Sequence, residues 1–137
     1  MSRRYLLVNR QRKHRVDSGA VRQMLDGLTR QLEIPGASFS VVFVTDAVMR
    51  SYNRRYRGYD KSTDVLSFPG ENGYLGDILI STETAYNQTR KSRTLNFDAN
   101  IHRLLLHGLL HLMGHDHERD HGEMRAIERR LRRRFGC

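Results

Sequence analysis

The sequence contains a single cysteine, Cys137, at its last position. A lone cysteine forms no disulfide within its own chain, which excludes the class of small secreted domains stapled by disulfides. The sequence also has no run of 18 apolar residues, which excludes a membrane-spanning helix. The apolar run at residues 5–8 is too short for a secretory signal peptide. We therefore expect a cytoplasmic protein that has no membrane partner.

Acidic side chains are few. The chain has 15 Asp and Glu against 24 Lys and Arg, which gives a net charge of +9. Arginine outnumbers lysine, and its guanidinium binds phosphate through two parallel hydrogen bonds. This charge favours a nucleic-acid partner, although a solvated basic surface would have the same composition. With 137 residues, no internal repeat and no low-complexity linker, residues 1–137 are expected to form one domain.

Hydrophobic periodicity predicts strands at residues 4–8, 37–44, 63–68 and 74–80, and helices at residues 17–32, 46–56, 83–93, 99–113 and 118–134. This order indicates an α+β fold with a mixed four-stranded sheet and about five helices. The expected helix caps are Asp17 or Ser18, Thr45, Ser81 or Thr82, and Asp98. The helix at 46–56 is expected to turn four apolar side chains inward: Val48, Met49, Tyr52 and Tyr56.

Histidines gather near the C-terminus of the fourth helix. His107 and His111 are four residues apart, so on a helix they lie one turn apart on one face. Gly114 is expected to end this buried central helix, because glycine adopts a left-handed turn without steric cost. After this turn comes His117, which is the third candidate ligand. Three protein nitrogens with a fourth position open to water are typical of a catalytic zinc site, so we expect one Zn²⁺ per chain.

Gly108 stands where a zinc protease of this spacing carries the glutamate that acts as general base. The usual route of peptide hydrolysis is therefore disfavoured, and a metalloprotease is the weaker hypothesis. His115 and His121 fit less well as ligands than the other three histidines. His115 is adjacent to the turn, and His121 comes one helical turn after His117 only if a helix has restarted there.

Three segments carry a family resemblance. Residues 107–117 resemble the H-G-x-L-H-L-x-G-Y-D-H signature of the bacterial rRNA-maturation endoribonuclease family (YbeY-like). Residues 53–69 are similar to its Y-R…D-K-P-T-D-V-L-S-F-P block, and residues 75–78 to its L-G-D-I strand. The resemblance runs from about residue 40 to the C-terminus. The chain departs from the pattern at His115, where the family has Tyr, at Ser62, where it has Pro, and at Arg103, where a His is expected.

The resemblance implies a zinc-dependent endoribonuclease, selective for single strands, that acts in 16S rRNA 3′-end maturation and ribosome quality control. Its implied partners are single-stranded rRNA precursors and the ribosome or ribosomal proteins. By position, His107, His111 and His117 match the metal ligands. Arg57 matches an arginine of the active cleft.

We interpret the chemistry as metal-assisted phosphodiester hydrolysis, in which Arg57 holds the scissile phosphate and stabilises developing charge. Asp64 and Asp77 either orient ligands and activate water or only form hydrogen bonds at strand ends. No general base is identified, and attack by the RNA 2′-hydroxyl remains an alternative. A further hypothesis is an rRNA-binding assembly factor with little catalysis, in which a fourth protein ligand closes the zinc site.

Overall fold

A computed structural model describes residues 5–32, 38–114 and 122–135 of the chain. Within these ranges four strands and five helices follow one another in the predicted order. In sequence they are β1 (Tyr5–Asn9), α1 (Ser18–Gln31), β2 (Ser38–Val44), α2 (Asp46–Arg57), β3 (Val65–Pro69), β4 (Tyr74–Ser81), α3 (Thr82–Arg90), α4 (Phe97–Leu112) and α5 (Glu123–Phe135).

The sheet is mixed, as the sequence predicts. Its strand order is β1-β2-β4-β3, with β2 parallel to both β1 and β4. The last pair, β3 and β4, is antiparallel and joined by a short turn. The apolar strand β2 therefore lies inside the sheet and is largely buried on both faces. By contrast, β3 is an edge strand of the described sheet.

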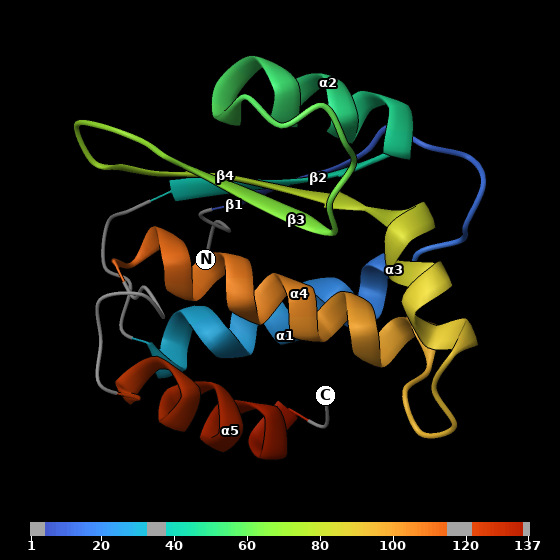
Figure 1. Ribbon diagram of the computed structural model, residues 1–137. Helices are drawn as coiled ribbons and strands as arrows, with labels where there is room; N and C mark the ends of the chain where they lie inside the picture. Colours follow the sequence, from blue (N-terminus) through green and yellow to red (C-terminus); the bar gives the residue numbers. More distant parts are fainter. Residues whose placement is uncertain (1–4, 33–37, 115–121, 136–137) are drawn as a thin grey trace.

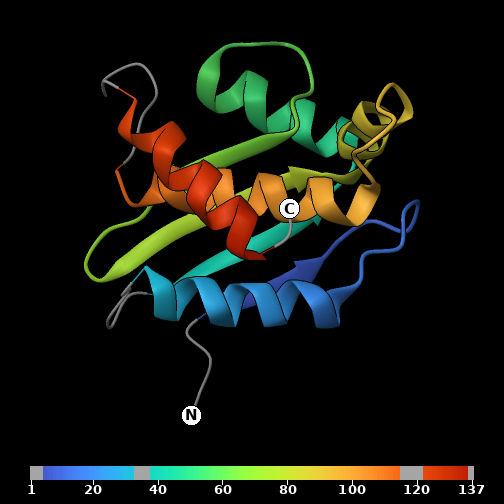
Figure 2. The ribbon, with the colours of Figure 1, turned by 90° about the horizontal axis from the view of Figure 1, so that it is seen from below.

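Helices cover both faces of the sheet. In Figure 1, α2 lies above the sheet, α1 and α4 lie below it, and α5 lies furthest below. The view from below in Figure 2 shows α5 across α4, and Leu131 of α5 is fully buried in the main core. This core lies between the sheet and the lower helices. A smaller cluster beneath α2 consists of Val44, Met49, Leu66 and Leu79. No helix in the described ranges is long and apolar enough to cross a membrane.

Helix caps agree with the predictions at three of four helices. Asp17, Thr45 and Ser81 accept hydrogen bonds from the backbone N–H groups of α1, α2 and α3. The expectation that Asp98 caps α4 is wrong. The side chain of Asn96 accepts from the backbone N–H of Ala99 at 2.8 Å, so α4 begins at Phe97. Phe97 packs against the main core, which explains why the helix starts two residues earlier than expected.

The inward face of α2 also differs from the prediction. Met49 is fully buried and Tyr52 is half-buried, as expected, but Val48 is 39% exposed and Tyr56 is 59% exposed. Asn53 is buried instead, and its amide donates to the backbone carbonyl of Lys61 at 2.9 Å. The helix therefore uses a polar side chain to hold the loop that follows it, and Tyr56 in its last turn stays open to solvent although its ring contacts Phe68 of β3.

Candidate active site

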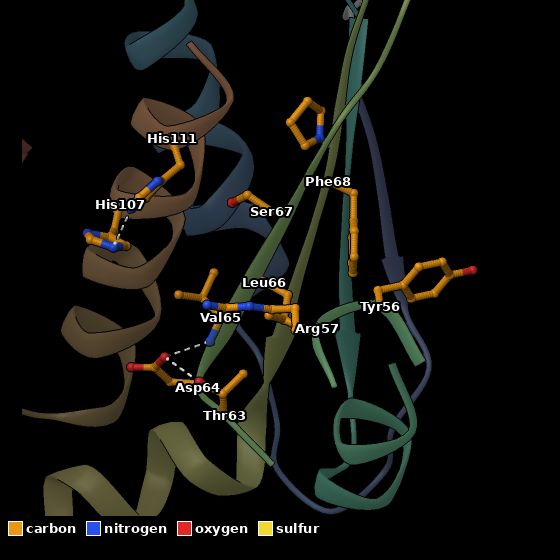
Figure 3. Close-up of a pocket in the computed structure, with 11 residues that line it drawn as sticks. Tyr56, Arg57, Thr63, Asp64, Val65, Leu66, Ser67, Phe68, His107 and His111 are labelled. Atoms are coloured by element: carbon orange, nitrogen blue, oxygen red, sulfur yellow. Dashed lines mark hydrogen bonds between the residues drawn. The ribbon is translucent and has the colours of Figure 1, made fainter. Parts of the chain in front are cut away.

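A cleft of about 680 Å³ lies along β3, between the C-terminus of α2 and the face of α4. Figure 3 shows His107 and His111 on one side of β3 and Tyr56 on the other. The edge strand between them contributes much of the wall. The lining residues are Tyr56, Arg57, Thr63, Asp64, Val65, Leu66, Ser67, Phe68, Pro69, His107 and His111.

The two histidines face each other. Nε2 of His107 and Nε2 of His111 are 3.0 Å apart, and the ring centroids are 4.6 Å apart. Two nitrogens bound at ~2.0–2.1 Å to one tetrahedral zinc ion lie about 3.3 Å apart. At the observed separation two nitrogen lone pairs repel, so a proton or a cation must lie between them. The pair thus has nearly the spacing of two ligands of one metal ion.

Glycine at position 108 brings α4 against the sheet at the level of the histidines. A Cβ there would lie 2.8 Å from Cγ2 of Ile78 and 3.2 Å from Oγ of Ser67. The Ser67 hydroxyl also donates to the Gly108 carbonyl at 3.0 Å. A glutamate side chain has no space at this position. The close packing accounts for the glycine and argues further against a metalloprotease.

The third predicted ligand, His117, lies outside the described residues, as do His115 and His121. The predicted end of α4 is confirmed, because Gly114 has φ 92° and follows the last helical turn. Within the described ranges no group of three His, Cys, Asp or Glu side chains could hold a metal ion. The three-histidine site therefore stays a prediction, of which the structure contains two members.

Arg57 reaches the cleft from the other side. It is the last residue of α2, and Gly58 ends the helix with φ 77°. Its guanidinium carbon lies 5.7 Å from the ring centroid of Tyr59, a cation–π contact that orients the side chain. The structure thus brings Arg57, His107 and His111 to one cleft, although Arg57 precedes His107 by 50 residues in sequence.

Comparison with known proteins places the chain in a family. The sequence profile described as Endoribonuclease YbeY matches residues 7–136. The chain belongs to the Endoribonuclease YbeY family. The match covers nearly the whole chain, including both histidines and Arg57.

Relatives named Endoribonuclease YbeY agree with this. One from Koribacter versatilis is 47% identical over 108 residues, which cover 77% of this chain and 70% of the relative. Another, from Geobacter metallireducens, is 36% identical over 138 residues, covering 94% of this chain and 91% of the relative. The solution structure of TM1509 from Thermotoga maritima has a TM-score of 0.68 at 23% identity and covers 96% of this chain, which shows the shared fold.

Glu128 completes the surroundings of the first histidine in this YbeY-family chain. Its Oε1 lies 2.9 Å from Nδ1 of His107, and both side chains are mostly shielded from solvent. A carboxylate only accepts hydrogen bonds, so Nδ1 carries the proton and Nε2 presents its lone pair to the cleft. Metal-binding histidines commonly have this arrangement. Sequence reasoning missed Glu128, although it is the one acidic residue among the arginines of residues 125–135.

The two aspartates considered with the site have different surroundings. Asp64 lines the cleft, and its carboxylate accepts from the backbone N–H of Val65 at 2.7 Å and from the amide of Gln88 at 3.0 Å. Asp77 does not line the cleft but a second hollow, where the hydroxyls of Ser40 and Tyr74 donate to it. The structure therefore gives Asp77 a hydrogen-bonding role inside β4, in the middle of the strand and away from the cleft, and keeps Asp64 near the site.

Asp46 fixes the loop that follows Arg57. Its carboxylate accepts hydrogen bonds from three hydroxyls, which join the start of α2 to that loop and to the start of α3. Burial raises the pKa of this carboxyl, but the three donors outweigh burial, and the pKa is lowered from its ordinary value. The carboxylate therefore stays ionised at neutral pH. The donors are Ser62, Ser81 and Thr84.

Proposed function

We propose that this protein is a zinc-dependent endoribonuclease that cleaves single-stranded RNA in the cleft along β3. The observation that carries the proposal is the 3.0 Å approach of the His107 and His111 Nε2 atoms in a cleft that Arg57 also lines. Family membership supports the reaction class, and the charge of +9 supports an RNA substrate.

Each of the proposed site residues would have a distinct role. His107, His111 and the predicted third ligand, His117, would hold the metal. A zinc ion held there would lower the pKa of its bound water towards ~7 and would polarise a phosphoryl oxygen. Glu128 holds the proton of His107 on Nδ1, which keeps the Nε2 lone pair directed at the cleft. Arg57 grips the scissile phosphate and stabilises charge that develops on its oxygens.

Within the reaction class, we infer that the substrate is a precursor of 16S rRNA, cut during 3′-end maturation, and that the protein takes part in ribosome quality control. Its partners would then be the ribosome or ribosomal proteins in the cytoplasm. The supports are the family membership and a basic surface suited to phosphate-rich partners.

Cleavage of defined RNAs tests the proposal. Zinc-loaded protein is incubated with a labelled single-stranded RNA and with the same sequence in a duplex. We expect cleavage of the single strand, loss of cleavage in His111→Ala, and full activity in His14→Ala, a histidine outside the cleft. If the folded protein, with its active-site geometry preserved, left the RNA intact, the result would instead support the assembly-factor hypothesis. Equal cleavage by His111→Ala would remove the histidine pair from the mechanism.

A further inference from the structure

An exposed aromatic ring stands at the rim of the cleft. Tyr56 directly precedes Arg57 in the last turn of α2, and it is 59% exposed. Burying a large aromatic ring is normally favourable, so an open one beside a candidate active site suggests a ligand that covers it. Tyr56 has no role in the chemistry described above, and neither do Tyr52 and Phe68, the two rings that it contacts.

The ring of Tyr56 is held in place on two sides. It stacks on Tyr52 with centroids 5.9 Å apart and an angle of 16° between the planes. It also meets Phe68 of β3 edge to face, with centroids 5.3 Å apart and an angle of 66°. An aromatic ring that its neighbours have already oriented loses little conformational freedom when a ligand stacks on it.

Tyr56 lies where a polymer could pass over the edge of the sheet. Together with Phe68 it lines both the histidine cleft and the second hollow, of about 610 Å³, on the α2 face. Figure 3 shows the Tyr56 ring beyond Phe68, pointing away from the histidine pair. An RNA strand that places one phosphate at Arg57 and the histidines can therefore cross β3 and bring a neighbouring base to the Tyr56 ring. Arg54 and Arg55 are exposed on the same turn and suit further phosphates.

Three other exposed tyrosines are less suited to stacking. Tyr74 lines no part of the cleft, and its hydroxyl donates to Asp77. Tyr59 already has the guanidinium of Arg57 and the ammonium of Lys61 within 5.7 Å of its ring centroid. Tyr86, on α3, stacks against His14 and lines no part of the cleft. Tyr56 thus combines a fixed ring, an open surface and a place beside Arg57.

We propose that Tyr56 stacks on an unpaired nucleobase next to the phosphate that Arg57 binds, and that this contact makes the cleft selective for single strands. The inference rests on the proposed RNA substrate. Bases inside a duplex stack on one another and cannot reach a protein ring without unpairing. A fixed aromatic ring accepts any unpaired base, because every base has a π face, so the contact selects strandedness rather than sequence.

The chain contains no tryptophan, which allows a direct optical test. Tyr56→Trp places a single indole at the proposed stacking position, and Tyr86→Trp is the matched control. Zinc-loaded protein is mixed with a short single-stranded RNA in a stopped-flow instrument, and indole emission is recorded before cleavage. Emission of Tyr56→Trp is expected to fall as the single strand binds and to stay constant with a duplex. Emission of Tyr86→Trp is expected to stay constant with both.

Affinity provides the second measurement. Tyr56→Leu keeps an apolar side chain against Tyr52 and Phe68 but removes the ring, and it should weaken single-strand binding by about 5- to 150-fold. Its duplex affinity and thermal stability should not change, and Tyr56→Phe should bind as the unaltered protein does. If labelled RNA binds but the emission of Tyr56→Trp does not respond, or Tyr56→Leu binds normally, stacking at Tyr56 is wrong and the proposed RNA substrate stands. If the unaltered protein binds neither RNA, the proposed function fails and the stacking role fails with it.

Discussion

Arg57 carries a guanidinium into the cleft that also contains the histidine pair. If it stabilises charge in the transition state, Arg57→Ala should reduce single-turnover cleavage by about 10²–10³-fold while zinc content and fold stay intact. Arg57→Lys should restore only part of the rate, because an ammonium group cannot form the bidentate contact. Rapid-quench measurement of the cleavage step checks this.

Arg55 is the control for Arg57, since it is exposed on the same helix and does not line the cleft. Arg55→Ala should weaken RNA binding slightly and leave the cleavage step unchanged. If the two alanine variants lowered affinity alike and neither altered the rate of cleavage, Arg57 would only position phosphates.

Glu128 should act on zinc through His107. Glu128→Gln replaces a charged acceptor of the Nδ1 proton with a neutral amide, and loss of such a partner typically lowers metal affinity ~10–100-fold. Competition with a zinc chelator measures the affinity without any assay of RNA cleavage. Glu71→Gln, at an exposed turn, should leave affinity unchanged. Equal zinc affinity in both variants would show that the contact between Glu128 and His107 is only a surface ion pair and does not affect zinc binding.

Single residues differ in how far the sequence identifies them. His107 and His111 follow from a spacing of four on one helix, because helical geometry alone brings them together. The contact between Glu128 and His107 spans 21 residues and depends on how α5 crosses α4, which no local pattern encodes. Tyr56 was expected inside because it fits the apolar stripe of α2, yet in the last turn of the helix it contacts only part of the sheet surface and is 59% exposed.

At the scale of elements, the close packing of α4 on β3 and β4 sets the position of the histidines. Gly108→Ala would raise helix propensity but would place a methyl group 2.8 Å from Ile78. We expect a loss of about 1–3 kcal/mol in the free energy of unfolding, as is typical when a packed core is overfilled. Urea denaturation of the zinc-free protein measures it.

Gly19→Ala serves as the control for Gly108→Ala. A Cβ at position 19 makes only an ordinary contact, 3.5 Å from a carboxylate oxygen of Asp17. An unfolded chain has fewer backbone conformations with alanine than with glycine at this position. The change should therefore leave the free energy of unfolding unchanged or raise it by up to about 1 kcal/mol. A stable Gly108→Ala protein would show that α4 can move away from the sheet at little cost.

The strands and helices could be predicted from the sequence where a single sequence signal dominated. The order of the elements predicted a mixed four-stranded sheet, and the structure has one, with β2 parallel to β1 and β4 and with β3 antiparallel to β4. The start of α4 was mispredicted because two cap residues, Asn96 and Asp98, stand two positions apart, and the packing of Phe97 decides between them. Competition of this kind is settled by tertiary contacts.

At the scale of the whole molecule, the charge of +9 should dominate RNA affinity. For single strands the logarithm of the binding constant should fall with the logarithm of salt concentration, with a slope near −0.7 per neutralised phosphate. Arg129 and Arg133 are exposed on α5 and line a shallow hollow. If both contact phosphates, removing their charges together should reduce the slope by about 1.4. Fluorescence anisotropy across a salt series measures this, and a salt-independent affinity would contradict the charge argument.

Zinc stoichiometry tests the central claim, that the facing histidines of α4 belong to a metal site. The protein is dialysed against zinc and then against metal-free buffer, and its zinc content is measured by mass spectrometry. The unaltered protein and His14→Ala should each retain about one zinc ion per chain, as expected for a single site with three protein ligands. The His107→Ala/His111→Ala double variant should retain almost none. Full zinc content in the folded double variant would contradict the account, because the metal would then be bound elsewhere.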